Sequence, residues 1–184
     1  LDKFINDYEK RFFILKGSAG TGKSTIITHF LQNEKYKNHK IVFSATTNKA
    51  VSVLKQLSKI DRKVDFLTIH KLLNIKRKIN KEGKEEFNIV LDNRKLIKAT
   101  SIFNYDIIII DECSMLSNDI IETLKSLRNI KGKIIFIGDP AQLPPVNEES
   151  YIFESKINNY ELTEIMRYKG KIVEMANKVR ELVF

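Results

Sequence analysis

The chain has 184 residues, of which 42% are apolar, and a formal net charge of +9. This length suffices for one sizeable core. No apolar run approaches the roughly 20 residues needed to span a bilayer, and residues 1–9 lack the pattern of a secretory leader. The single cysteine, Cys113, excludes an internal disulfide and a cysteine-based metal cluster. We therefore expect a soluble, cytoplasmic protein without membrane contact, and the basic excess favours a polyanionic partner only weakly.

A glycine-rich segment follows the first predicted strand. Residues 11–16 form an apolar run, and residues 24–31 form an amphipathic run that predicts a helix. The intervening GSAGTGKST matches G-x-x-x-x-G-K-[ST] at each fixed position. Backbone N–H groups of such a loop surround a polyphosphate, and the dipole of the following helix attracts the same charge. The predicted nucleoside triphosphate site comprises Gly17, Ser18, Ala19, Gly20, Thr21, Gly22, Lys23, Ser24 and Thr25, with Lys23 on the β- and γ-phosphates and Ser24 on Mg²⁺.

The rest of the chain alternates strands and helices, which is typical of an α/β fold. Strands are predicted at 40–45, 105–111, 133–138 and 160–162, and helices at 48–60, 117–128 and 170–182. The isoleucines at 107–110 are apolar on both faces of their strand, which predicts a position in the centre of a parallel sheet.

Residues 74–104 interrupt this alternation and predict a small insertion. Two alternating runs flank the segment KEGK at 81–84, which indicates a β-hairpin with Gly83 in the turn. Lys76, Arg77 and Lys78 make the first run basic. A finger that contacts a phosphate backbone and a solvated surface loop are both consistent with this pattern.

Polar side chains follow two of the predicted strands. Asp111 and Glu112 come directly after the isoleucine strand, at the carboxyl end where ligands of parallel sheets bind. Asp111 can hold Mg²⁺ through water opposite Ser24, and Glu112 can accept a proton from the water that attacks the γ-phosphate. Gln142 lies in GDPAQLPPV after the strand at 133–138. Its amide can bind the γ-phosphate or the attacking water, but a purely structural proline-rich bend explains this segment equally well.

The order of these segments resembles a known family. GSAGTGKST, IIIIDECSML and GDPAQLPPV resemble motifs I, II and III of superfamily 1 helicases. SATTNKAV at 44–51, TIHKLL at 68–73 and ELTEIMR at 161–167 resemble motifs Ia, Ib and IV of the branch that moves 5′ to 3′, the RecD-like and Dda-like enzymes. The resemblance implies a P-loop NTPase with a RecA-like parallel sheet flanked by helices. Residues 1–73 and 105–184 would form motor domain 1A, and residues 74–104 a 1B-like hairpin that separates strands.

The resemblance also assigns roles at matching positions. Lys23, Glu112, Gln142 and Arg167 would be catalytic, with Gln142 sensing the γ-phosphate and Arg167 stabilising transition-state charge. Ser24 and Asp111 would hold Mg²⁺ beside ATP. Single-stranded DNA would be held, without sequence readout, by Thr46, Asn48, Lys49, Thr68 and His70 and, on the hairpin, by Lys76, Arg77, Lys78 and Phe87. A buried structural histidine remains open for His70, and packing against the main domain remains open for Phe87.

Several family features have no counterpart in this sequence. Motifs V and VI are missing, and so is the upstream glutamine that reads adenine. We therefore expect a second RecA-like lobe as a partner, together with single-stranded DNA and a duplex junction. This chain alone should bind Mg·ATP weakly, with negligible hydrolysis and unwinding. A translocase that does not unwind, a non-catalytic nucleic-acid-binding module and an RNA track remain alternatives.

Overall fold

The computed structural model describes residues 1–58, 60, 63–79, 85–88, 101–127, 130–145 and 152–164. Its strands are β1 (Phe12–Gly17), β2 (Ile41–Ala45), β3 (Asp65–Thr68), β4 (Lys76–Ile79), β5 (Glu85–Asn88), β6 (Ile107–Ile110), β7 (Lys133–Gly138) and β8 (Asn158–Leu162). Its α-helices are α1 (Asp2–Ile5), α2 (Lys23–Leu31), α3 (Asn48–Leu57), α4 (Ile69–Leu72) and α6 (Asn118–Ser126). Short 3₁₀ turns are η1 (Glu34–Tyr36), η2 (Ser101–Asn104) and η3 (Cys113–Met115).

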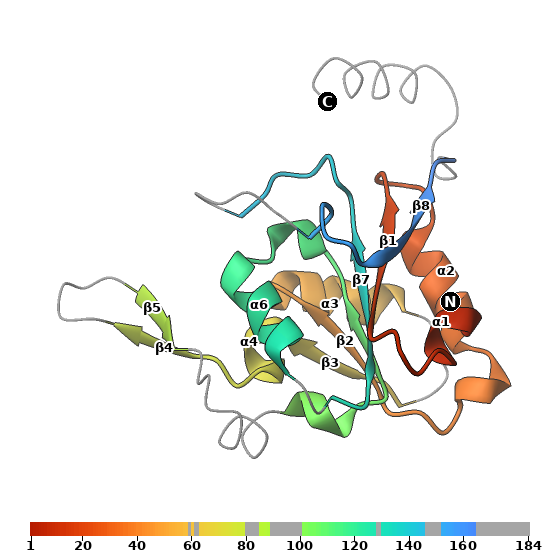
Figure 1. Ribbon diagram of the computed structural model, residues 1–184, viewed down its shortest axis with the longest axis horizontal. Helices are drawn as coiled ribbons and strands as arrows, with labels where there is room; N and C mark the ends of the chain where they lie inside the picture. The colour runs from red at the N-terminus through yellow and green to blue at the C-terminus, as the bar shows by residue number, and fades with distance from the viewer. Residues whose placement is uncertain are drawn as a thin grey trace.

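The main sheet has six parallel strands in the order β3-β2-β6-β7-β1-β8 (Figure 1). Ile110 pairs with Ser44 of β2 on one side and with Phe136 of β7 on the other. The predicted central position of the isoleucine strand is therefore confirmed. The strand β7 separates β1 from β6, so the loop after β7 lies between the loops after the other two strands.

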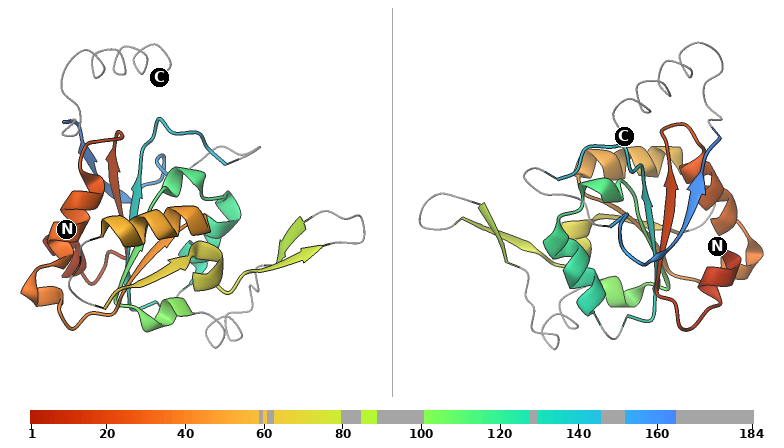
Figure 2. Two further views of the ribbon diagram at one scale, coloured as in Figure 1. Left: turned by 180° about the vertical axis from the view of Figure 1, so that it is seen from behind. Right: turned by 45° about the horizontal axis from the view of Figure 1, so that its top comes forward.

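Helices cover both faces of this sheet (Figure 2). Alternate residues of β6 divide between two cores: Ile108 and Ile110 pack in the cluster that includes α4 and α6, whereas Ile107 and Ile109 pack in the cluster that includes α1, α2 and α3. All four isoleucine side chains are fully buried. This two-sided burial explains why the strand is apolar at every position.

A separate hairpin projects from the main sheet (Figure 1). Its strands β4 and β5 pair antiparallel, with Lys76 opposite Asn88 and Ile79 opposite Glu85. The predicted hairpin is thus confirmed for its two strands. Its turn, including Gly83, lies outside the described residues.

Several element boundaries, one strand and two short helices differ from the sequence-based expectation. Helix α3 ends at Leu57, earlier than predicted, and α6 begins after Ser117. The strand β3 and the short helices α1 and α4 have no counterpart among the predicted elements. The predicted helix at 170–182 lies outside the described residues. Among the helices that the structure describes, none has the length and apolarity to cross a membrane.

Candidate nucleotide site

The glycine loop connects β1 to α2 in a conformation that depends on glycine. Gly20 and Gly22 have φ angles of 82° and 85°, in the left-handed region that other residues rarely adopt. Gly17 has a different constraint: a Cβ atom there would lie 2.6 Å from Thr21 Oγ1 and 3.0 Å from the carbonyl oxygen of Leu162. The glycines therefore form a tight loop whose N–H groups lead into the first turn of α2.

Lys23 folds back over this loop. Its Nζ donates hydrogen bonds to the carbonyl oxygens of Gly17, at 2.5 Å, and Ser18, at 2.8 Å. Ser24 and Thr25 are exposed beside it at the start of α2. The site thus combines an ammonium group, hydroxyl groups and a helix N-terminus on one surface, which is the donor set that a polyphosphate requires.

The acidic pair lies on the same edge of the sheet. The N–H of Asp111 donates to the carbonyl oxygen of Ser44 at 2.8 Å, which extends the pairing of β6 with β2. Burial raises the pKa of Asp111, and the positive charge of Lys23 partly opposes that rise. The positive charge of Lys23 therefore acts on the Asp111 carboxylate, which follows β6 on the same edge of the sheet as the glycine loop.

The backbone of Glu112 adopts an uncommon conformation. Its φ angle is 54°, in the left-handed region that is costly for a residue with a side chain. Its N–H donates to Asp111 Oδ1 at 3.0 Å, which supports this conformation. Strained residues of this kind concentrate at functional sites, where the surrounding structure holds them in place.

Asp139 joins the loop after β7 to the glycine loop, a role that sequence reasoning did not assign. Its Oδ2 accepts a hydrogen bond from the N–H of Ala19 at 3.2 Å, and its Oδ1 accepts from the N–H of Ala141 at 3.0 Å. The side chain is buried, with 4% exposure. The sequence does contain one indication of this role: Asp139 directly follows Gly138 at the carboxyl end of a buried strand.

Gln142 lies on the exposed turn that Asp139 anchors. Its N–H donates to the carbonyl oxygen of Asp139 at 3.1 Å. Its side-chain Oε1 accepts a hydrogen bond from Ser114 Oγ, also at 3.1 Å. The loops after β1, β6 and β7 are therefore connected by hydrogen bonds.

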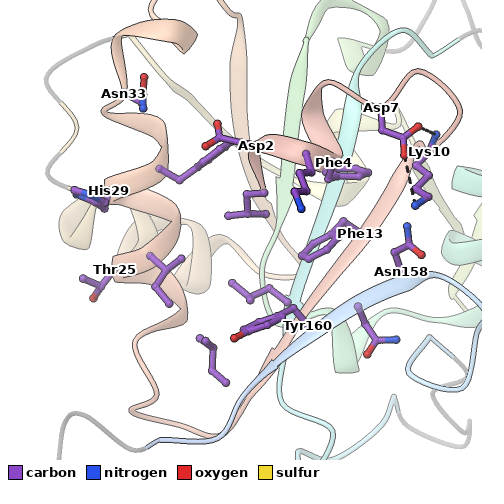
Figure 3. A pocket seen from close by; sticks show the side chains of 17 residues that line it. Asp2, Phe4, Asp7, Lys10, Phe13, Thr25, His29, Asn33, Asn158 and Tyr160 are labelled. Atoms are coloured by element: carbon purple, nitrogen blue, oxygen red, sulfur yellow. Dashed lines mark hydrogen bonds and ion pairs between the residues drawn. The ribbon is translucent and has the colours of Figure 1, made fainter.

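Two pockets adjoin the glycine loop. The smaller, of about 540 Å³, is lined by Thr21, Gly22, Thr25, Ile26 and residues 160–164. The larger, of about 920 Å³, continues from it along α2 and β8, with Phe13 and Tyr160 among its walls (Figure 3).

The DNA-contact residues predicted outside the hairpin lie at or just after the ends of β2 and β3, on the same edge of the sheet. Ala45 of β2 pairs with Thr68 of β3, so the segments that follow these strands emerge side by side. Asn48 and Lys49 are exposed at the start of α3, whereas the hydroxyl oxygen of Thr46 is buried without a hydrogen-bond partner among the described residues. Thr68 is buried, and its Oγ1 accepts from the N–H of Lys71, which caps α4. His70 is half-buried.

Other predicted site residues lie outside this description. Arg167 is not among the described residues. Lys76, Arg77, Lys78 and Phe87 belong to β4 and β5, whose backbone pairing is described but whose side chains are not.

A parallel sheet with a glycine loop after β1 and acidic residues after β6 defines a P-loop NTPase domain with a RecA-like fold. A family model described as an AAA domain matches residues 3–148. The chain belongs to this family of AAA domains, and it is a RecA-like lobe of the superfamily 1 helicase type.

Individual relatives agree with this assignment. An uncharacterized protein of Acanthamoeba polyphaga mimivirus is 39% identical over 90% of this chain and 36% of its own length. The RecBCD enzyme subunit RecD of Buchnera aphidicola subsp. Schizaphis graminum is 34% identical over 75% of this chain and 24% of its own length. The Pif1 helicase from Candida albicans has a similar fold, with a TM-score of 0.62 and 23% identity over 91% of this chain and 40% of that chain. The chain thus spans well under half of each of these proteins.

Proposed function

We propose that this chain is the ATP-binding lobe of a DNA helicase that moves 5′ to 3′ along single-stranded DNA. The observation that carries this proposal is the hydrogen-bonded contact between three loops that resemble helicase motifs I, II and III. Asp139 bonds Ala19, and Ser114 bonds Gln142. A motor needs such contacts because nucleotide state must reach several loops at once.

We assign the phosphates of ATP to the glycine loop. N–H groups of the loop and of the first turn of α2 would hold them, and Lys23 would exchange its carbonyl partners for the β- and γ-phosphate oxygens. The smaller pocket beside Thr25 has room for the ribose and base. Proteins usually bind Mg²⁺ through one or two side chains, phosphates and water. Ser24 and Asp111 suit that pattern, and the ion would supply neutralisation of phosphate charge.

Three further residues would carry hydrolysis. Glu112 would accept a proton from the attacking water, in the manner of a general base. Gln142 would contact the γ-phosphate, and Arg167 would stabilise charge in the transition state. A second RecA-like lobe of the full-length protein would complete the site. We therefore expect weak Mg·ATP binding and negligible turnover from this chain alone.

The DNA track would cross the ends of β2 and β3. Asn48 and Lys49 are exposed at the N-terminus of α3, where the helix dipole favours a phosphate. Thr46, Thr68 and His70 lie in the neighbouring segments and would also contact the DNA. Contacts of this kind hold the nucleic-acid backbone without reading its sequence, and they are compatible with RNA in place of DNA.

The hairpin of β4 and β5 would act as the strand-separating pin. It projects from the sheet and follows α4, next to the proposed track (Figure 1). Lys76, Arg77 and Lys78 would contact phosphates, and Phe87 would pack against the last base pair. In this proposal residues 74–104 are the 1B-like insertion, and residues 1–73 and 105–184 are domain 1A.

Unwinding by the full-length protein tests the proposal. The substrate is a fluorescently labelled duplex with a single-stranded tail at either the 5′ or the 3′ end. We expect ATP- and Mg²⁺-dependent separation of the 5′-tailed duplex only. Replacing residues 76–88 by a flexible linker should abolish separation and preserve DNA-stimulated ATP hydrolysis.

Other results of this assay would support a different function. Hydrolysis stimulated by DNA without any strand separation would indicate a translocase. DNA binding without hydrolysis would indicate a non-catalytic module, which the presence of Lys23, Asp111 and Glu112 disfavours. Equal unwinding after loss of the hairpin would remove its role as a pin.

A further inference from the structure

Ser114 connects the loop after β6 to the loop after β7, and the hydrolysis proposed above assigns no role to its side chain. It lies in η3, directly after the acidic pair, and its side chain is 1% exposed. Its Oγ donates a hydrogen bond to Oε1 of Gln142 at 3.1 Å. A buried hydroxyl from one loop thus holds the side chain of an exposed residue on another loop.

The two ends of an amide are chemically different. The Oε1 of glutamine only accepts hydrogen bonds, whereas its Nε2 only donates them. Phosphate oxygens are acceptors, so only Nε2 can bind a γ-phosphate. With Oε1 occupied by Ser114, Nε2 of Gln142 is the end that remains available for such a ligand.

The position of the turn is set separately. Asp139 accepts hydrogen bonds from Ala19 of the glycine loop and from Ala141 of the turn, and its carbonyl oxygen accepts from the N–H of Gln142. These three bonds hold the backbone of Gln142 beside the phosphate loop. They leave the rotation of its terminal amide undetermined.

We propose that Ser114 is a positioning residue that orients the amide of Gln142, so that Nε2 faces the γ-phosphate. This inference rests on the proposed function, because it assumes that a triphosphate occupies the glycine loop. It adds a direct connection from the loop of Asp111 and Glu112 to the residue that distinguishes ATP from ADP.

A double-mutant cycle in the full-length protein separates orientation from structural support. The proteins are the wild type, Ser114→Ala, Gln142→Ala and the double variant. The measurements are DNA-stimulated kcat and the dissociation constants of ADP and of the non-hydrolysable analogue AMP-PNP. Ser126→Ala is a matched control, because Ser126 Oγ also donates a hydrogen bond, to the Thr123 carbonyl oxygen on α6.

The expected effects follow from the loss of one hydrogen bond. Ser114→Ala should lower kcat and AMP-PNP affinity by about 3- to 10-fold, with ADP affinity unchanged. In the Gln142→Ala background the same substitution should have no effect, because the amide it orients is gone. The control should match the wild type in all three measurements.

Other outcomes overturn the inference. Equal losses with and without Gln142, or equal losses for ADP and AMP-PNP, would assign Ser114 a structural role. An unchanged Ser114→Ala protein would also refute it. A wild type that binds ADP and AMP-PNP equally and hydrolyses nothing would instead remove the proposed function itself.

A second variant covers the case in which Ser114→Ala does not fold. Gln142→Glu keeps an acceptor for Ser114 but has no Nε2 donor. Preference for AMP-PNP over ADP should then disappear while ADP still binds. A retained preference would contradict the assigned orientation.

Discussion

Gly138, the last residue of β7, is a sensitive position beside the proposed site. A Cβ atom at this position would lie 2.6 Å from Cys113 Sγ and 2.9 Å from Cζ of Phe153. Cys113 is fully buried and directly follows Glu112. Gly138→Ala therefore forces an overlap between the end of β7 and the side chain of Cys113 in η3.

The size of the expected loss of stability depends on which of these two neighbours can move. Phe153 is only half-buried, and its ring can rotate away. Cys113 is packed on all sides, so its displacement requires a shift of η3. Inserting one carbon atom into such a core destabilises proteins by about 1–3 kcal/mol. We expect a loss of this size for Gly138→Ala, together with reduced ATP hydrolysis because Glu112 moves with Cys113.

Urea unfolding followed by circular dichroism measures this loss, since the chain has no tryptophan for fluorescence. Cys113→Ala removes the Sγ atom and should relieve the overlap. The double variant should then be more stable than the sum of the single effects by at least about 1 kcal/mol. Additive effects within about 0.5 kcal/mol, or a neutral Gly138→Ala variant, would refute the reasoning.

Three further predictions concern the site and the core. Glu112→Gln should lower DNA-stimulated ATP turnover of the full-length protein by at least about 100-fold and leave ATP affinity intact, as measured by steady-state kinetics and equilibrium binding. Gly132→Ala should destabilise the chain by about 3 kcal/mol or more in urea unfolding, because its Cβ would meet the backbone carbonyl of Tyr105, which cannot swing aside. Burial and a hydrogen bond to the Asp65 carboxylate raise the pKa of Tyr105 from 10.0 to about 12. The unfolded chain therefore loses this proton first, so stability should fall between about pH 10 and 12, and less so in Tyr105→Phe, as thermal unfolding across this range will test.

Local sequence was sufficient for much of the fold. The four isoleucines of β6 predict a central strand because both faces of such a strand are buried. The glycine loop was predictable because its backbone geometry depends on residues adjacent in the chain. The strand pair β4 and β5 was predictable because a hairpin is also a local structure.

Other elements could not be predicted, because their own residues contain too little information about the structure they form. The strand β3 has only four residues, and just one of them is buried, so it is defined mainly by its pairing with β2. The helix α1 is a single turn that packs Phe4 into the core beside α2. Such elements form because of neighbours that are distant in sequence.

The sequence by itself determined the chemical groups of the candidate site: a phosphate loop, an acidic pair and an amide, each at the carboxyl end of a predicted strand. Only the tertiary structure decided how these groups are connected. The bond from Ala19 to Asp139 joins residues 120 positions apart, and the bond from Ser114 to Gln142 spans 28 positions. The left-handed backbone of Glu112 likewise has no pattern in the sequence. Strand order brings these loops together, and that order is set by packing across the whole sheet.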